Sequence, residues 1–234
     1  MKQVTWAALT IACLVQPACN SKNGMVQIAA NSVQETSTNF MMDQYEAVVV
    51  NKKVVDSATG AEATLPIGES RIGVLPTAGV TFTEAKKYCA DAGKRICTMK
   101  EWLTACAGPK NYRSGLQATP TSPGLIDKKC YLNQAVPNFE TGEPAKLVKT
   151  GSYSQCQTSG LSVHDLIGNV SEWVVDEATS DGRAMGPNAY SPLNEGVCNT
   201  YVKDDTNNDG DGDAPIANDA NLPVVGFRCC ANPS

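Results

Sequence analysis

The chain has 234 residues, 42% of them hydrophobic, and a formal net charge of −5. This composition supports one or two domains with a sizeable core, and β-rich single domains of this length are ordinary. The lysines are scattered and form no basic stripe, and aromatic residues make up only 6%. Nucleic acid is therefore not expected as a partner, and no stacking platform for bases or sugars is indicated.

The N-terminus has the pattern of a bacterial export signal. Lys2 precedes an apolar stretch, residues 4–15, which is too short to span a bilayer as a helix. We predict a signal peptide over residues 1–18, a lipid on Cys19 and a polar tether over residues 19–24. Gln16 and Pro17 depart from the usual lipoprotein cleavage site, and simple secretion is the alternative. The predicted location is extracytoplasmic: a lipoprotein of the periplasm or outer membrane, otherwise a secreted protein.

Ten cysteines are consistent with export. An even number remains after Cys13 and Cys19, and an oxidising compartment favours disulfides. There is no C-x-x-C pair and only one histidine, His164, so a structural zinc site is not expected. The disulfide candidates are Cys89, Cys97, Cys106, Cys130, Cys156, Cys198, Cys229 and Cys230.

The first half of the chain predicts strands followed by two helices. Residues 25–28 and 45–50 have the pattern of strands, and residues 56–79, rich in glycine and proline, are expected to form a loop. A helix is expected from Thr83 to Ala92, ended by Gly93. A second helix is expected to end at Ala107.

Thr98 and Glu101 have the spacing of a capping box at the start of the second helix. The alternative for Glu101, with Lys94 and Arg95, is a functional role. Capping and surface ion pairing explain these three residues more simply.

Residues 161–176, LSVHDLIGNVSEWVVD, are the most informative stretch. Gly168 and Asn169 favour a turn, and Trp173 is expected to anchor it in the core. The oxygens of Asn169 and Glu172 are ligands of the kind calcium prefers. The alternative is a turn between two strands with a buried tryptophan.

Four motifs occur in a fixed order: MDQYEA at 42–47, GKRICTMKEW at 93–102, GNVSEW at 168–173 and GFRCC at 226–230. Together they resemble the formylglycine-generating-enzyme family, also called the sulfatase-modifying-factor family. The resemblance covers residues 25–230 and implies one domain over 25–234. It implies an α+β fold with a C-type-lectin-like core, two helices, many loops and disulfides.

The resemblance also suggests metal ligands. In the family an asparagine at the position of Asn133, with a neighbouring carbonyl, helps to bind a structural calcium, so the resemblance implies that role for Asn133 and Gln134. His164 stands where the family usually has an aromatic residue, so we expect a packed imidazole rather than a catalytic one. The family's iron-dependent sulfoxide synthases need several histidines and are excluded.

Catalytic members of this family hold copper between two nearby cysteines, because soft thiolates suit Cu(I). The matching segment, residues 183–202, offers only Cys198 and lacks the R-G-G-S sequence, so copper is not expected. Cys198 is then either a remnant of the copper site or half of a disulfide with Cys229 or Cys230. Our next expected pair is Cys106 with Cys130.

An acidic loop places oxygen ligands at alternate positions: Asp205, Asn207, Asp209, Asp211 and Asp213. Gly210 permits the sharp turn, so the loop resembles the start of an EF-hand and predicts structural calcium. The glutamate expected at its end is replaced by Ile216, for which Asp219 is a possible substitute. The alternative is a solvated, metal-free loop.

We therefore predict a non-catalytic, calcium-stabilised binding or envelope module, held at the membrane by its lipid. One alternative is a metal-dependent oxidase that acts on an exported protein. The other is a calcium-dependent domain that recognises a glycan or a protein. The ligand itself is not indicated by the sequence, since fold alone does not settle function.

Overall fold

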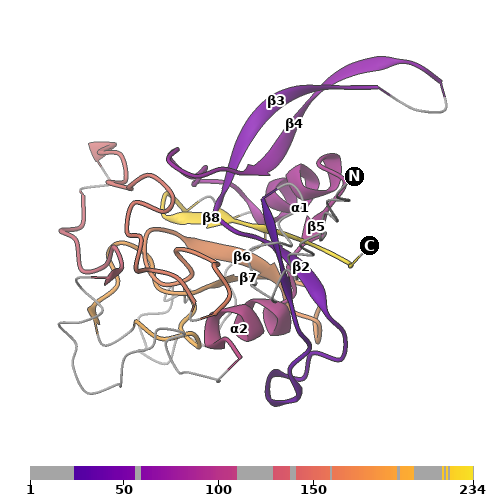
Figure 1. Ribbon diagram of the computed structural model, residues 1–234. Helices are drawn as coiled ribbons and strands as arrows, with labels where there is room; N and C mark the ends of the chain where they lie inside the picture. Colours follow the sequence, from indigo (N-terminus) through magenta and orange to yellow (C-terminus); the bar gives the residue numbers. More distant parts are fainter. Residues whose placement is uncertain are drawn as a thin grey trace, which may run out of the picture.

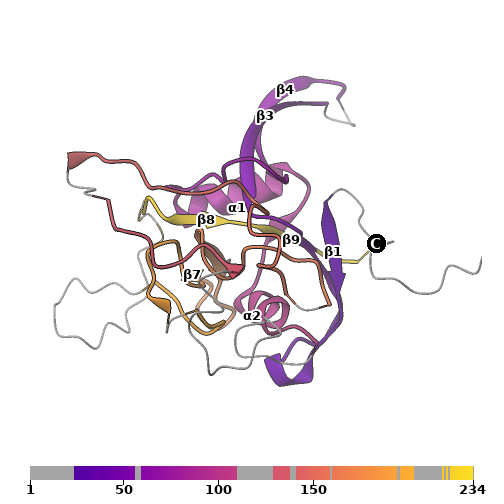
Figure 2. The same ribbon diagram turned by 60° about the vertical axis from the view of Figure 1, so that its left-hand side comes forward.

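The computed structural model describes residues 24–55, 59–109, 129–137, 141–158, 160–193, 196–202, 218, 220 and 222–233. The termini of this part meet in one four-stranded sheet (Figures 1 and 2). Its strand order is β1 (Met25–Ile28), β2 (Phe40–Asp43), β9 (Cys229–Ala231) and β5 (Arg95–Ile96). All its neighbouring strands are antiparallel. A 3-10 turn, η2 (Ser32–Gln34), lies between β1 and β2.

A three-stranded sheet carries the central motif. Its order is β7 (Gly182–Met185), β6 (Ser171–Val175) and β8 (Val225–Phe227), with β6 parallel to β8. All three residues of β8 and the first four of β6 are buried. The end of the motif at 168–173 therefore lies in the buried strand β6, next to the start of the motif at 226–230 in β8.

Two helices cover these sheets, as predicted. Helix α1 (Phe82–Asp91) begins one residue before the expected start and has its own capping box, Thr81 with Glu84. Helix α2 (Met99–Ala107) begins at the predicted box, in which the Glu101 N–H donates to Thr98 Oγ1 at 3.2 Å. Both helices follow directly from local sequence signals.

The predicted loop over 56–79 is wrong in part, because β4 (Glu62–Ser70) lies within it. β4 pairs with β3 (Ala47–Val55) in a continuous antiparallel register of nine residues. Pro66 and Gly68 suggested a break in the strand. A side chain at Gly68 would lie 2.8 Å from the Phe227 ring, so glycine serves close packing at this position.

Two groups of buried side chains form the core, one around Trp102 and the other around Trp173. Trp173 is fully buried and donates from Nε1 to the Val80 carbonyl at 2.8 Å. The predicted anchoring role of this tryptophan is confirmed. In the part of the chain that the structure describes, no helix is long and apolar enough to cross a membrane.

All eight core cysteines form disulfides, and both predicted pairings were wrong. The pairs are Cys89–Cys229, Cys97–Cys230, Cys106–Cys198 and Cys130–Cys156. Cys229 and Cys230 are neighbours on β9, so their side chains point to opposite faces of the strand. Cys229 therefore meets α1 and Cys230 meets the segment after β5, which leaves neither for Cys198.

Candidate functional site

A buried arginine joins the sequence motifs at the centre of the domain. Arg228 is fully buried, and its Nε and Nη2 donate to the two carboxylate oxygens of Glu172 at 2.7 and 2.6 Å. Its Nη1 donates to the Asp43 carbonyl at 3.0 Å, and Nη2 also donates to the His164 carbonyl at 2.8 Å. The guanidinium thus links β2, the segment before β6, and β6 itself.

Glu172 has a third donor, since Trp102 Nε1 donates to its Oε2 at 2.7 Å. Both carboxylate oxygens are therefore occupied by protein donors, and the side chain is fully buried. A bidentate charge-assisted pair of this kind satisfies a buried charge well. The calcium role predicted for Glu172 has no free oxygen to support it in this arrangement.

Asn169 connects the turn to a second buried carboxylate. Its Nδ2 donates to Glu46 Oε2 at 2.6 Å, while its Oδ1 accepts from the Val148 N–H at 3.0 Å. The Val170 N–H also donates to Glu46, at 3.2 Å. Asn169 has a φ of 59°, as the predicted turn requires. Its side-chain oxygen, like those of Glu172, is committed to the protein.

Asp165 is the third buried acid in this region, and it accepts from the Gly151 N–H at 2.7 Å. Burial raises the pKa of Asp165 to about 6. Burial also raises the pKa of Glu46 well above its usual value, and the charges of Asp165 and Glu172 add to the effect. One guanidinium thus faces three carboxyl groups, and the raised pKa values indicate that not all three are charged together.

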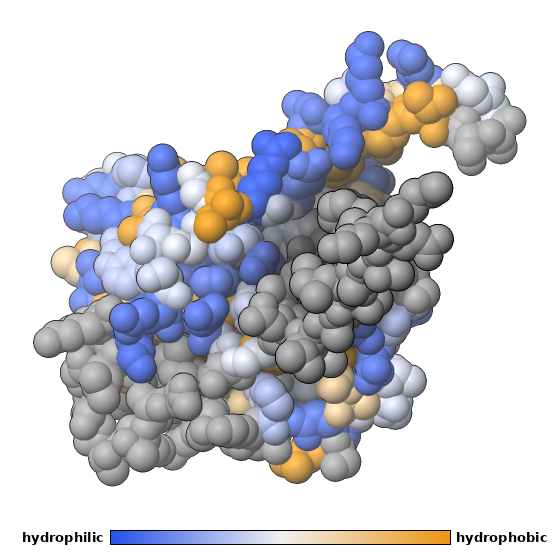
Figure 3. Space-filling model, viewed as in Figure 1, coloured by the Kyte–Doolittle hydropathy of each residue, from blue (hydrophilic) through white to orange (hydrophobic). Residues whose placement is uncertain are grey.

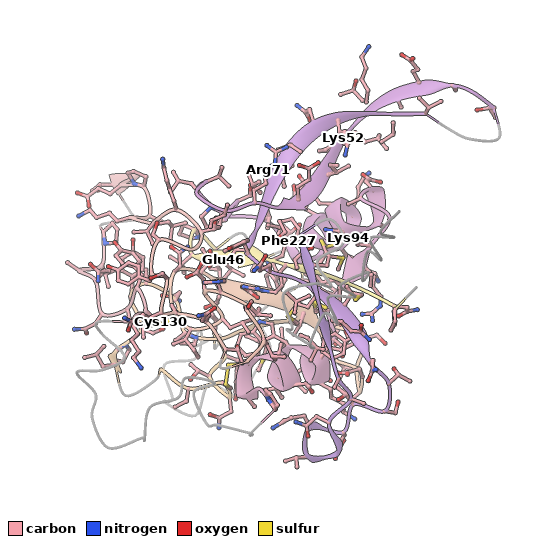
Figure 4. All side chains as sticks on the ribbon, in the orientation of Figure 1. Glu46, Lys52, Arg71, Lys94, Cys130 and Phe227 are labelled. Carbon is pink, nitrogen blue, oxygen red and sulfur yellow. A yellow bond between two sulfur atoms is a disulfide. The ribbon has the colours of Figure 1, made fainter. Side chains whose placement is uncertain are left out.

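Asp43 lies at the edge of this network in an ion pair with Lys94, at 2.6 Å. Its other oxygen accepts from the Cys229 N–H at 3.1 Å. Arg95 pairs with Glu101 at 2.5 Å beside the helix cap, as expected, but only Arg95 is partly exposed and Glu101 is buried. Lys94 differs from the expectation, because its partner is a fully buried carboxylate. Figure 4 shows Lys94 and Glu46 on the body of the domain.

His164 is packed as expected, stacked on Tyr45 with ring centroids 5.0 Å apart. Burial, helped by the charge of Arg228, lowers the pKa of His164. Its Nδ1 is buried and has no hydrogen-bond partner. A neutral imidazole in a packing role fits these surroundings.

The remaining predicted ligands are not brought to this network. Asn133 is exposed with a φ of 58°, and the Gln134 side chain donates to the Leu132 carbonyl at 2.7 Å. Within the described ranges, no group of three or more acidic, histidine or cysteine side chains is arranged to hold a metal. Cys19, Ile216, Asp219 and the acidic-loop residues Asp205, Asn207, Asp209, Asp211 and Asp213 lie outside the described residues.

The cysteines do not fit a copper centre. Cys198, the remnant candidate, is bonded to Cys106 on α2, and these two residues are 5% and 0% exposed. The other six core cysteines are also paired. A copper ion would require two thiolates, and the eight described cysteines offer none while they are disulfide-bonded.

Sequence reasoning did not assign roles to Asp43, Glu46, Asp165 or Arg228. All four lie in or beside the ordered motifs, at MDQYEA, in the central stretch and in GFRCC. The clearest available signal was Arg228, a single charge between Phe227 and Cys229, because a charge in an apolar motif requires a buried partner.

These features define a disulfide-rich α+β domain organised by a buried arginine–glutamate pair. A family model for the sulfatase-modifying factor enzyme 1-like domain matches residues 22–233, and the chain belongs to this family.

Two curated relatives are similar to the chain. A formylglycine-generating enzyme of Thermomonospora curvata is 28% identical over 182 residues, which are 68% of this chain and 56% of the relative. The inactive C-alpha-formylglycine-generating enzyme 2 of Bos taurus is 27% identical over 168 residues, 67% of this chain and 50% of the relative. The chain thus spans about half the length of these relatives.

Among solved structures, the crystal structure of CarF matches with a TM-score of 0.46 and 13% identity. The match covers 84% of this chain and 87% of CarF.

Proposed function

We propose that this chain is a non-catalytic member of its family and acts as an exported binding or envelope module. The observation that carries the proposal is the pairing of all eight core cysteines in disulfides. The bovine relative is described as inactive, which supports the same interpretation. Four disulfides are typical of proteins that fold in an oxidising compartment, which supports the proposed export. The proposal includes a lipid on Cys19 as the membrane anchor.

A count of free thiols tests this proposal. The mature protein is alkylated without reductant and its mass is compared with that of a reduced, unfolded sample. We expect no label on the core cysteines before reduction and eight labels afterwards. The mass of the mature chain also reports whether Cys19 carries a lipid.

Label on Cys106 and Cys198 in the folded protein would contradict the non-catalytic role. These two cysteines would then form the thiolate pair that a copper-dependent oxidase needs. The next measurement would be a Cu(I) titration against a competing chelator, followed by an oxidation assay on a cysteine peptide.

Calcium is proposed at the acidic loop, residues 205–213, rather than at Glu172, because Glu172 would have to leave Arg228 to bind a metal. Such extracellular sites bind with Kd on the order of 0.1–1 mM. About 10 mM calcium should then stabilise the fold by roughly 1–3 kcal/mol, or a few degrees in Tm.

The measurement is a thermal melt with calcium, with magnesium and with a chelator. The matched variant, Asp205→Asn with Asp209→Asn, should lose the calcium-dependent increase and otherwise melt like the parent protein in chelator. An increase that survives in this variant would place the calcium elsewhere in the domain.

A further inference from the structure

The hairpin of β3 and β4 is buried at its base, at Ile67 and Gly68, and exposed at residues 51–53 and 61–64. Its two strands project from the body as a two-stranded ribbon (Figures 1 and 2). Lys52 lies on this projecting part (Figure 4). A two-stranded ribbon is only marginally stable in water, and a third strand would stabilise it. The ribbon therefore has two edges on which another strand could pair.

The outer edge of β4 is closed to pairing by a proline. Pro66 faces Asn51 in the register and has no N–H to donate. In an antiparallel ladder, backbone groups alternate between the partner strand and the outside. Pro66 occupies a position whose N–H would point outwards, so this edge lacks a donor at its middle. Proline is a common device against unwanted pairing at a sheet edge.

The outer edge of β3 is hydrogen-bonded to Thr77 at the base of the hairpin, and its outward backbone groups beyond that point are free within the described residues. The Val49 N–H donates to Thr77 Oγ1 at 2.8 Å, and the Thr77 N–H donates to the Ala47 carbonyl at 2.9 Å. The outward-pointing groups of β3 are therefore those of its odd-numbered residues, and the register continues without a bulge. The backbone groups of Asn51, Lys53 and Val55 must then also point outwards. Within the described residues, they have no hydrogen-bond partner.

The side chains along this edge indicate what could pair there. Val50, Val54 and Leu65 are half-buried on one face of the ribbon, which gives an apolar row that a third strand would extend. Lys52 lies between Val50 and Val54 on this face and Lys53 lies on the opposite face, with side chains 59% and 79% exposed. Figure 3 shows hydrophobic and hydrophilic residues close together along the hairpin.

The two lysines disfavour a second copy of this chain as the partner in the registers that are centred on them. Symmetric antiparallel pairing centred on either lysine would place two like charges directly opposite each other, which is destabilising. Their internal partners are Glu69 at 3.4 Å and Glu62 at 3.8 Å, both on the far strand, β4. Exposed pairs of this kind contribute little, so the lysines remain available to carboxylates on the open side.

We propose that the outer edge of β3 binds an extended segment of another protein as a third strand. That segment would carry acidic residues beside Lys52 and Lys53 and apolar residues beside Val50 and Val54. Backbone hydrogen bonds to Asn51, Lys53 and Val55 supply affinity, and the lysines supply specificity. This inference names the partner class of the binding module and rests on the function proposed above.

The test uses a synthetic peptide, Thr-Val-Glu-Glu-Thr-Val-Thr, which in an antiparallel register places glutamates opposite Lys53 and Lys52 and valines opposite Val54 and Val50, and the full domain with its disulfides intact. Binding is followed by NMR, which also reports hydrogen exchange at the backbone amides of residues 51, 53 and 55. We expect these amides to become protected, and binding to weaken at least 10-fold when alternate peptide amides are N-methylated.

Two proline variants at one rung of the ribbon provide a matched pair, because Lys53 and Thr64 face each other. Lys53→Pro removes an outward donor from the β3 edge, and Thr64→Pro removes one from the β4 edge. We expect at least a 10-fold loss of peptide binding in the first variant and little change in the second. NMR dispersion of the hairpin amides checks that both variants keep the ribbon.

Three results would overturn the proposal. One is equal binding to both proline variants, and another is binding that survives N-methylation but disappears in salt, which would indicate charge attraction alone. The third is concentration-dependent dimerisation through β3, which would make a second copy the occupant. If the peptide does not bind but the core cysteines resist alkylation, only the strand-docking proposal is rejected. If Cys106 and Cys198 are alkylated, the non-catalytic function itself is rejected.

Discussion

Replacing Arg228 with methionine is expected to lower the free energy of unfolding by about 3–5 kcal/mol, because it leaves the Glu172 carboxylate buried without its counter-charge. The guanidinium makes two bonds to Glu172 and one to each of two backbone carbonyls. Methionine fills much of the same volume but donates nothing. The loss should appear as a lower midpoint in urea unfolding of the disulfide-intact protein, with an unchanged slope.

Arg95→Met is the matched control. Arg95 also forms a bidentate pair, with Glu101, but its side chain is 37% exposed. Glu101 is buried, but it keeps the Thr98 N–H as a donor, and water can enter where the partly exposed Arg95 side chain was. This change should therefore cost less than Arg228→Met, about 1–2 kcal/mol. Similar costs for the two variants would show that the burial of Arg228 does not decide its contribution.

A double variant separates two contributions to the free energy of unfolding: the interaction between Arg228 and Glu172, and the cost of leaving one buried charge without its partner. Arg228→Met combined with Glu172→Leu removes both charges, and we expect it to be more stable than Arg228→Met alone. A double variant that loses the sum of the two single losses would contradict this account, since it would show no coupling between the two residues.

The parts of this fold that sequence predicts well are those with local causes. Helix α2 begins at Thr98 because a hydroxyl and a carboxylate three residues apart satisfy the first free amides of the helix. The turn at Asn169 follows from a residue that tolerates positive φ. The family resemblance added the order of the motifs and hence the fold class, which the family match confirms.

The parts that sequence misses are decided at long range. β4 was missed because Pro66 and Gly68 are local strand breakers, and only the packing of Phe227 and the free outer edge explain why they are tolerated. The disulfide partners depended on the two faces of β9, which no spacing reveals. The acidic loop was read from spacing alone, and its calcium site remains a prediction.

The candidate site shows the same division. The motifs indicated that Glu172 and Asn169 are important, and oxygen chemistry suggested calcium. Which donor meets those oxygens depends on Arg228 and Val148, brought in from distant segments. The same composition can therefore serve an ion pair or a metal site, and only the three-dimensional arrangement separates them.

The second large effect concerns pH. Burial raises the pKa of Asp165 from 3.8 to about 6, so the folded protein retains a proton that the unfolded chain has already lost. Stability falls with rising pH wherever the folded state binds more protons. The contribution of Asp165 is therefore largest at about pH 4 and is lost as pH rises through about 6, by roughly 3 kcal/mol at most.

Asp165→Asn should remove this fall while keeping an acceptor for the Gly151 N–H. The measurement is urea unfolding of both proteins from pH 4 to pH 8. We expect the variant to gain stability relative to the parent as pH rises, reaching its full advantage above about pH 7. Glu62→Gln, at an exposed carboxylate, is the control for the loss of a carboxyl group as such.

The comparison between variant and parent is needed because neighbouring groups titrate in the same range. Glu46 has a raised pKa and contributes in the same direction as Asp165. His164 has a lowered pKa, so its contribution falls as pH drops through about 6.5 and partly offsets the other two. These contributions are largely common to both proteins and cancel in the difference. A pH-independent difference between Asp165→Asn and the parent would mean that Asp165 is charged in the folded protein over the whole range, so that Arg228 faces more than one carboxylate even at acidic pH.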